Sequence, residues 1–193
     1  MSQSSRKILI VYAHPDPRDS HVNRIMLNMA EHVVGVTISD LYEKYPDFYI
    51  DTRTEQRLLL THDLIVFQHP VYWYSCPAML KQWQETVLEH GFAYGSNGDA
   101  LHGKDCLLAL SAGASLSAYR EDGLHGFVFG ELTRHLQQTI RFCGMRDLPP
   151  LLFFGAREAE NSDIEAHAQW YARLLSRYVC DGIEALKKGL SHA

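Results

Sequence analysis

Residues 8–12, ILIVY, form an unbroken run of apolar side chains close to the start of the chain. A strand with one face in water alternates apolar and polar residues, whereas this run has no polar position. Such a strand is typical of the centre of a parallel sheet, where both faces are buried. His14 and Pro15 follow closely and end the run. The pattern predicts an α/β fold in which helices cover both faces of a sheet.

Four further apolar runs follow, with helical patterns between them. The expected strands are residues 8–12, 36–41, 64–67, 107–111 and 151–154, and the expected helices are about residues 21–33, 54–61, 78–90, 130–143 and 164–186. Residues 42–51 and 91–103 are expected to be loops, and residues 187–193 a frayed end. Parallel strands joined by helices need right-handed crossovers. We therefore expect one domain over residues 1–193, a doubly wound five-stranded parallel sheet with the flavodoxin-like strand order 2-1-3-4-5.

Composition excludes several classes of function. A formal net charge of −5 and the lack of a basic run argue against nucleic-acid binding. The four cysteines are scattered and form no C-x-x-C pair, so we expect free thiols in a reducing cytoplasm. The eleven histidines fall at no metal-ligand spacing, so no metal site is expected. No segment approaches the roughly 18 apolar residues of a membrane span.

The loop after the first strand has the features of a phosphate site. Ser20 stands at a helix N-cap position, with His14 before it and Asn23 after it. Free N–H groups at a helix start bind phosphate well. The alternative is that Ser20 only caps the helix and His14 is an ordinary turn residue.

Two other loops leave the same edge of the expected sheet. The loop after the third strand carries Pro70, Val71, Tyr72, Trp73 and Tyr74, whose rings suit a large flat heterocycle. The alternative is that these rings fill the core or an interface. Ligands of doubly wound sheets lie at the carboxyl ends of the strands. Three loops at this edge therefore predict a pocket.

The loop after the fourth strand supplies the third wall of that pocket. Gly113 and its small neighbours Ala112, Ala114 and Ser115 let a ligand approach the backbone closely. Tyr119 and His125 follow as candidates for hydrogen bonds to a ring that gains charge. The alternative is that both are surface residues of the loop.

Several motifs together resemble the flavodoxin-like NAD(P)H:quinone oxidoreductase family, and within it the ancillary proteins of glutathione-regulated Kef potassium efflux systems. The motifs are YAHP at 12–15, SHVN at 20–23, DLY at 40–42, YPDF at 45–48, QHPVYWYSCP at 68–77, LKQW at 80–83 and GFAYG at 91–95. They are specific in combination, and the resemblance covers nearly the whole chain.

The resemblance implies a role for each loop. The flavin phosphate and ribityl end would be held by His14, Ser20, His21, Val22 and Asn23, the isoalloxazine would be lined by Pro70, Val71, Tyr72, Trp73 and Tyr74, and its pyrimidine side would be wrapped by Ala112, Gly113, Ala114 and Ser115. Tyr119 and His125 would assist hydride transfer. The family commonly has Thr-Thr-Gly-Gly where this chain has SAGA at 111–114, so the added methyl of Ala114 is expected to weaken flavin affinity.

These implications define the expected function. The chain would be an NAD(P)H dehydrogenase (quinone) in which hydride passes from NAD(P)H to flavin and then to a quinone by a ping-pong mechanism. The cofactor would be FMN rather than FAD, in a homodimer. The protein would be cytoplasmic, and a Kef-type potassium/proton antiporter as partner would place it at the cytosolic face of the inner membrane. The alternative is a non-catalytic regulatory subunit with a structural or lost flavin.

Overall fold

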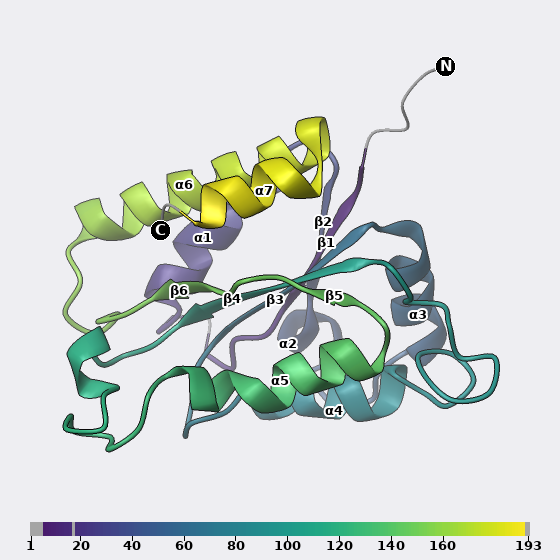
Figure 1. Cartoon of the computed structure of the whole chain (residues 1–193), viewed down its shortest axis with the longest axis horizontal. Coiled ribbons are helices and arrows are strands. Elements are labelled where there is room, and N and C mark those ends of the chain that lie inside the picture. The colour runs from purple at the N-terminus through teal and green to yellow at the C-terminus, as the bar shows by residue number, and fades with distance from the viewer. Residues whose placement is uncertain (1–5, 17, 192–193) are drawn as a thin grey trace.

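The computed structural model describes residues 6–16 and 18–191. In this part of the chain, six parallel strands form one sheet (Figure 1). The strands are β1 (Ile8–Tyr12), β2 (Val36–Asp40), β3 (Leu64–Pro70), β4 (Asp105–Ser111), β5 (Arg146–Asp147) and β6 (Leu151–Phe153). Their order is β2-β1-β3-β4-β5, with β6 also paired to β4. The predicted flavodoxin-like order is confirmed, with a sixth strand added.

The extra strand arises because the edge of the sheet is interrupted. β5 pairs with the start of β4, through Asp105 and Cys106, and β6 pairs with its end, from Ala109 to Ser111. Pro149 and Pro150 lie between the two pieces. Proline has no N–H to give to a neighbouring strand, so these two residues break the ladder. The expected fifth strand is thus the second half of a longer edge.

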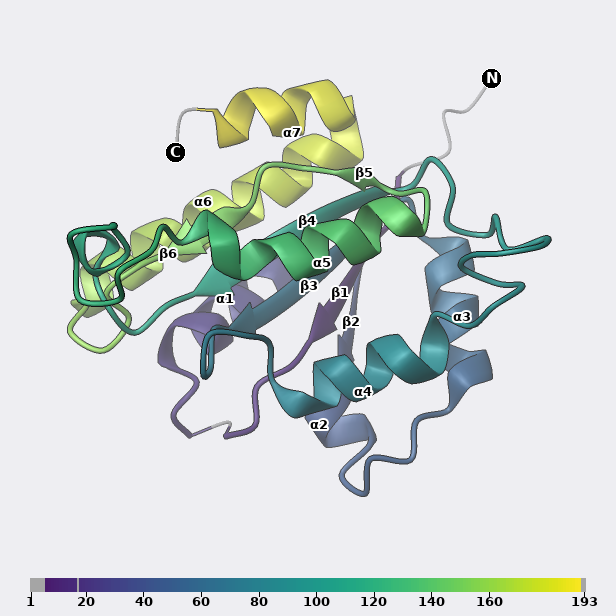
Figure 2. The same ribbon diagram turned by 60° about the horizontal axis from the view of Figure 1, so that its bottom comes forward.

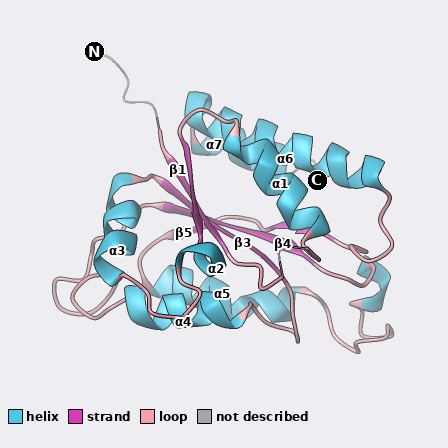
Figure 3. Cartoon of the chain, turned by 180° about the vertical axis from the view of Figure 1, so that it is seen from behind, coloured by secondary structure: helices cyan, strands magenta, loops and turns pink. Residues whose placement is uncertain are grey.

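Helices cover both faces of the sheet (Figure 2). They are α1 (His21–Glu31), α2 (Leu41–Lys44), α3 (Thr52–Thr61), α4 (Ala78–Val87), α5 (Gly130–Phe142), α6 (Asn161–Asp181) and α7 (Ile183–Leu190), with a short 3₁₀ helix η1 (Leu116–Ala118). Side chains from α1, α6 and α7 pack on one face, and those from α2 to α5 pack on the other. Figure 3 shows this three-layer arrangement from behind.

The two apolar cores follow from the alternation of side chains along each strand. In β1, Leu9 and Val11 join the core beneath α4 and α5, while Ile8 and Ile10 join the core beneath α1 and α6. All four are completely buried. Strand β1 is therefore apolar on both faces, as its sequence predicts.

Three expectations about the elements were wrong. The last helix does not run unbroken over residues 164–186, because Gly182 adopts φ 86° and ψ −165°, a conformation open essentially to glycine alone. The end of the chain is not frayed from residue 187, since α7 continues to Leu190; residues 192–193 lie outside the described part. The expected loop at 42–51 contains most of α2, which Asp40 caps through the N–H groups of Tyr42 and Glu43.

Two further properties bear on function. The cysteines Cys76, Cys106, Cys143 and Cys180 are all free thiols. Across residues 6–16 and 18–191, none of the helices combines the length and the apolar character that crossing a membrane demands.

Candidate functional site

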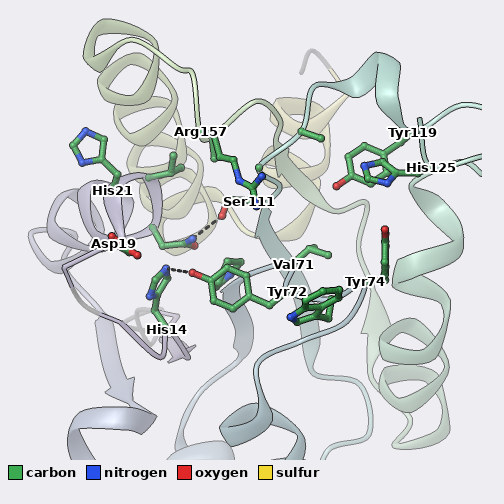
Figure 4. Close-up of a pocket in the computed structure, with 17 residues that line it drawn as sticks. His14, Asp19, His21, Val71, Tyr72, Tyr74, Ser111, Tyr119, His125 and Arg157 are labelled. Atoms are coloured by element: carbon green, nitrogen blue, oxygen red, sulfur yellow. Dashed lines mark hydrogen bonds between the residues drawn. The ribbon is translucent and has the colours of Figure 1, made fainter. Parts of the chain in front are cut away.

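A cavity of about 730 Å³ lies at the carboxyl ends of β1, β3, β4 and β6 (Figure 4). It is lined by His14, Asp19, His21, Val22, Asn23, Pro70, Val71, Tyr72, Trp73, Tyr74, Ser111, Gly113, Ala114, Tyr119, His125, Ala156 and Arg157. The cavity is of the size that holds a cofactor or a drug-sized molecule. The three loops that the sequence singled out meet here.

The start of α1 forms one end of the cavity and has no side-chain cap. The hydroxyl of Ser20, the N-cap residue, instead bonds the buried hydroxyl of Tyr12 at 2.6 Å. Burial raises the pKa of Tyr12 to about 12, so this phenol stays protonated. Among the described residues, the N–H groups of Val22 and Asn23 have no acceptor. Two donors of the first turn therefore remain available to a ligand.

Asn23 links the start of α1 to the end of β4. Its side-chain Nδ2 donates to the hydroxyl of Ser111 at 2.7 Å, and its backbone carbonyl accepts from Gln68 at 2.8 Å. Asn23 is 2% exposed, and its Oδ1 has no donor in the part of the chain that the structure covers. A buried acceptor without a donor is costly, so this oxygen is suited to a hydroxyl of a bound molecule.

His14 is buried at the same end and is uncharged at neutral pH. Its Nδ1 accepts from the N–H of Asp16 at 3.2 Å, so the proton resides on Nε2, which lies 3.3 Å from the Tyr72 hydroxyl. Burial lowers the pKa of His14 below its usual value. His14 thus holds the Tyr72 hydroxyl at this end of the cavity (Figure 4).

Tyr72 and Ser75 bracket a tight turn whose two central residues are aromatic. The backbone N–H and carbonyl groups of Tyr72 and Ser75 exchange hydrogen bonds of 3.0 Å each way. Trp73 and Tyr74 have φ values of 48° and 64°, the signs of a type I′ turn, where Asn and Gly are usual. Trp73 is 93% exposed at the tip. The backbone of both residues is strained, and their side chains do not fill the core. This indicates that Trp73 and Tyr74 bind a ligand.

Tyr119 and His125 form a stacked pair on the opposite wall. Their ring centroids are 4.4 Å apart with planes inclined by 26°, and Tyr74 meets the His125 ring edge-on. Burial raises the pKa of Tyr119, so its hydroxyl is a proton-bearing donor. This hydroxyl points into the cavity (Figure 4). The Nε2 atom of His125 is buried without a partner among the residues described.

Gly113 and Arg157 form the wall between these two ends. A Cβ atom at Gly113 would lie 3.0 Å from Nε of Arg157, so glycine lets the arginine lie flat against the backbone. The loop that bears Arg157 is tied to the loop after β4, because Gly155 and Ala156 donate to the carbonyls of Ala114 and Ala112. The guanidinium extends toward Ser111 (Figure 4).

Most of the predicted residues line this cavity. Those that do are His14, His21, Val22, Asn23, Pro70, Val71, Tyr72, Trp73, Tyr74, Gly113, Ala114, Tyr119 and His125. Ser20 and Ala112 lie behind it, being 1% and 2% exposed, and the N–H of Ala112 is already bonded to the carbonyl of Phe153. Ser115 lies outside the lining, and its hydroxyl bonds that of Ser117.

Four lining residues were missing from the prediction. They are Asp19, Ser111, Ala156 and Arg157. Ala156 and Arg157 follow the last strand, so the rule that ligands bind at carboxyl ends would have selected them. Their loop, FGARE, lacks the aromatic or histidine cluster that marks the other three. Ser111 is the last residue of β4, and its small side chain gave no signal.

Comparison with known proteins gives a consistent result. The family model described as flavodoxin-like fold matches residues 6–175. The chain is 43% identical over 182 residues to the glutathione-regulated potassium-efflux system ancillary protein KefG of Salmonella newport, a match that covers 94% of this chain and 99% of the relative.

Solved structures match over similar lengths. General stress protein 14 from Treponema denticola, in complex with FMN, is 39% identical with a TM-score of 0.83, covering 88% of this chain and 97% of that one. An NADPH-quinone reductase from P. pentosaceus is 29% identical with a TM-score of 0.78, covering 91% of this chain and 98% of that one.

Proposed function

The chain belongs to the family with the flavodoxin-like fold, and from this premise we propose that it is an FMN-dependent NAD(P)H:quinone oxidoreductase. One observation carries the proposal. A single cavity of about 730 Å³ joins an uncapped helix start at one end to an aromatic turn at the other. This is the order of groups in FMN, whose phosphate and flat ring are joined by a chain of hydroxyls.

The residues at the phosphate end fit the cofactor. The free N–H groups of Val22 and Asn23 would hold the phosphate, because the helix dipole favours negative charge there. The carboxylate of Asp19 also lines this end, but it is exposed, so solvent screens its charge. The orphaned Oδ1 of Asn23 would accept a ribityl hydroxyl. His14 and His21 would border the phosphate, and burial of His14 lowers its pKa.

The residues at the ring end fit as well. Pro70, Val71, Tyr72, Trp73 and Tyr74 would line the isoalloxazine. Gly113 and Ala114 have no acceptor for their N–H groups within the described residues, so these donors are available to the edge of the ring. Ala114 lines the cavity, and its methyl group would lower flavin affinity relative to a second glycine.

When bound, FMN accepts a hydride from NAD(P)H and passes it on to an acceptor. Each substrate would bind in turn at the open side of the cavity, beside the exposed rings of Trp73 and Tyr74. Tyr119 directs its protonated hydroxyl toward the place where negative charge develops, and His125 fixes the Tyr119 ring by stacking. The similarity to an NADPH-quinone reductase supports this assignment of substrates.

Steady-state turnover of the FMN-loaded protein with NAD(P)H and a soluble quinone tests the proposal. We expect turnover by the unmodified protein and a loss of about tenfold or more in Tyr119→Phe, with FMN still bound, because one preorganised donor is removed. Tyr49→Phe, which alters an exposed tyrosine away from the cavity, is the matched control. The absence of quinone-dependent oxidation of NAD(P)H would contradict the proposal.

The identity to KefG supports a second role, as an ancillary protein of a Kef-type potassium efflux antiporter. Potassium efflux from cells that express the antiporter alone, with the unmodified protein, or with Tyr119→Phe separates the two roles. Efflux that rises equally with both proteins would identify a regulatory role independent of turnover. Efflux that is unchanged by either would remove the ancillary role.

A further inference from the structure

Arg157 is a cation that neither the sequence motifs nor the proposed roles account for. Of the residues described as lining the cavity, it alone is a lysine or arginine. It forms no ion pair with a carboxylate in the part of the chain that the structure describes. Burial lowers the pKa of His14, so the guanidinium of Arg157 is the permanent positive charge among the described lining residues.

The position of Arg157 is set by its surroundings. Its Nε, Cδ and Cγ atoms lie 3.0–3.3 Å from the place where a Cβ of Gly113 would be, so the side chain rests on the backbone of the loop after β4. Backbone bonds from Gly155 and Ala156 to the carbonyls of Ala114 and Ala112, at 2.8 and 3.0 Å, fix the two loops together. A planar guanidinium in this setting presents several N–H donors toward the cavity.

The charge lies beside the loop after β4, between the two ends of the cavity. Arg157 lowers the pKa values of Tyr72 and Tyr119, which stand on different walls, against the larger raising effect of burial. Its contact with Gly113 places it at the part of the cavity where the edge of a flat ring would approach the backbone.

We propose that Arg157 binds the pyrimidine edge of the bound flavin and stabilises the negative charge of its reduced form, thereby raising the flavin's reduction potential. This inference rests on the proposed function. Hydride transfer gives the flavin two electrons and one proton and leaves NAD(P)⁺, so the reduced ring carries one negative charge. An arginine at that edge therefore binds the reduced cofactor more tightly than the oxidised one.

The experiment compares the midpoint potential and the FMN dissociation constant of the unmodified protein with those of Arg157→Gln, Arg157→Lys and Arg53→Gln. Arg53→Gln removes the same charge from an exposed site on α3, outside the cavity. We expect Arg157→Gln to lower the ratio of reduced to oxidised affinity roughly tenfold, the effect of one hydrogen bond to a charged group. For a two-electron couple this is a fall of about 30 mV. Arg157→Lys and Arg53→Gln should stay close to the unmodified value.

Each outcome decides the matter. An unchanged potential in Arg157→Gln overturns the inference while the proposed function stands. An equal fall in Arg157→Lys overturns it as well, since the charge is then not the cause. If FMN affinity is lost to the same extent in both oxidation states, Arg157 binds the phosphate and not the ring. If the unmodified protein binds no flavin, the proposed function fails together with the inference.

Discussion

The hydroxyl of Ser20 determines what the start of α1 is free to bind. A serine at this position usually caps its own helix. Here the Tyr12 hydroxyl, 2.6 Å away at the end of β1, bonds the serine, and the N–H groups of Val22 and Asn23 have no acceptor among the described residues. Ser20 thus occupies the N-cap position but leaves the start of the helix uncapped.

Tyr12→Phe tests this reading. Without the phenol, the Ser20 hydroxyl is free to turn toward the helix and cap it, which is worth about 1 kcal/mol. A ligand must then displace the cap, so we expect FMN to bind about fivefold more weakly. The double variant Tyr12→Phe with Ser20→Ala should regain the original affinity. Fluorescence titration of FMN measures all three proteins, and equal weakening in the single and double variants would contradict the reading.

Site residues were predictable where the residues next to them in sequence form a recognisable motif. His14 and Trp73 stand in motifs of unusual composition, and the structure puts both in the cavity. Ser111 and Arg157 were missed, because no local motif marks them and their contacts are distant in sequence. Ser111 meets Asn23 across 88 positions, and Arg157 rests on Gly113. Neither contact leaves a local pattern.

At the scale of elements, the turn between Tyr72 and Ser75 holds two aromatic residues in a conformation that suits Asn and Gly. Each residue held at positive φ costs on the order of 1 kcal/mol or more. Such strain is tolerated where the side chains bind something.

We expect Trp73→Asn combined with Tyr74→Gly to stabilise the FMN-free protein by about 1–2 kcal/mol, because both new residues adopt the turn readily. The same variant should bind FMN more weakly, since the aromatic platform is gone. Urea unfolding and FMN titration provide the two readings. Lower stability of the variant would show that the rings support the fold instead.

Glu55 on α3 joins four elements beneath the sheet. It is completely buried, yet its carboxylate accepts from the Trp83 indole at 2.9 Å, the Tyr45 hydroxyl at 2.8 Å and the Ser39 hydroxyl at 3.1 Å, and it pairs with Lys44. A buried charge with every partner in place fixes the geometry of its surroundings.

Removing this carboxylate leaves several buried donors unpaired. We expect Glu55→Ala to lower the free energy of unfolding by about 3–5 kcal/mol. Glu55→Gln should cost less, because its amide oxygen still accepts. Glu85→Ala, at an exposed pair on α4, should change stability by no more than about 0.5 kcal/mol. A Glu55→Ala cost as small as that of Glu85→Ala in urea unfolding would contradict this account.

Element boundaries were predictable where the apolar period is strong and failed where a single backbone feature decides. The helix expected over residues 164–186 keeps its apolar period across Gly182, so only the φ of that residue reveals the break. Strand β5 is two residues long and only partly buried. A strand that short has no apolar run to detect.

At the scale of the whole molecule, the arrangement of the sheet places the cavity. Strands that are apolar on both faces require helices on both sides, and the flavodoxin-like order opens a crevice at the carboxyl ends. For this reason the location of the cavity could be predicted from the sequence, although the wall formed by Ala156 and Arg157 was not predicted.

Stability should depend on pH through His69, which is buried within β3. Burial lowers the pKa of His69 to about 4, whereas the unfolded chain has the usual value near 6.5. Between these values the unfolded state binds the proton and the folded state does not, so stability falls as the pH falls. The full loss is on the order of 3 kcal/mol. Urea unfolding between pH 7 and 4 should show a shallower loss in His69→Gln, and equal slopes would contradict the assignment.

The most direct test of the central claim is an anaerobic titration followed by visible absorption. The FMN-loaded protein is titrated with NADPH, or with NADH, and a quinone is then added. We expect the flavin bands to bleach with one equivalent of reduced nucleotide and to return with one equivalent of quinone, since each transfer carries two electrons. A protein that binds no FMN, or whose bound FMN neither nucleotide reduces, would contradict the assignment of this cavity to an oxidoreductase.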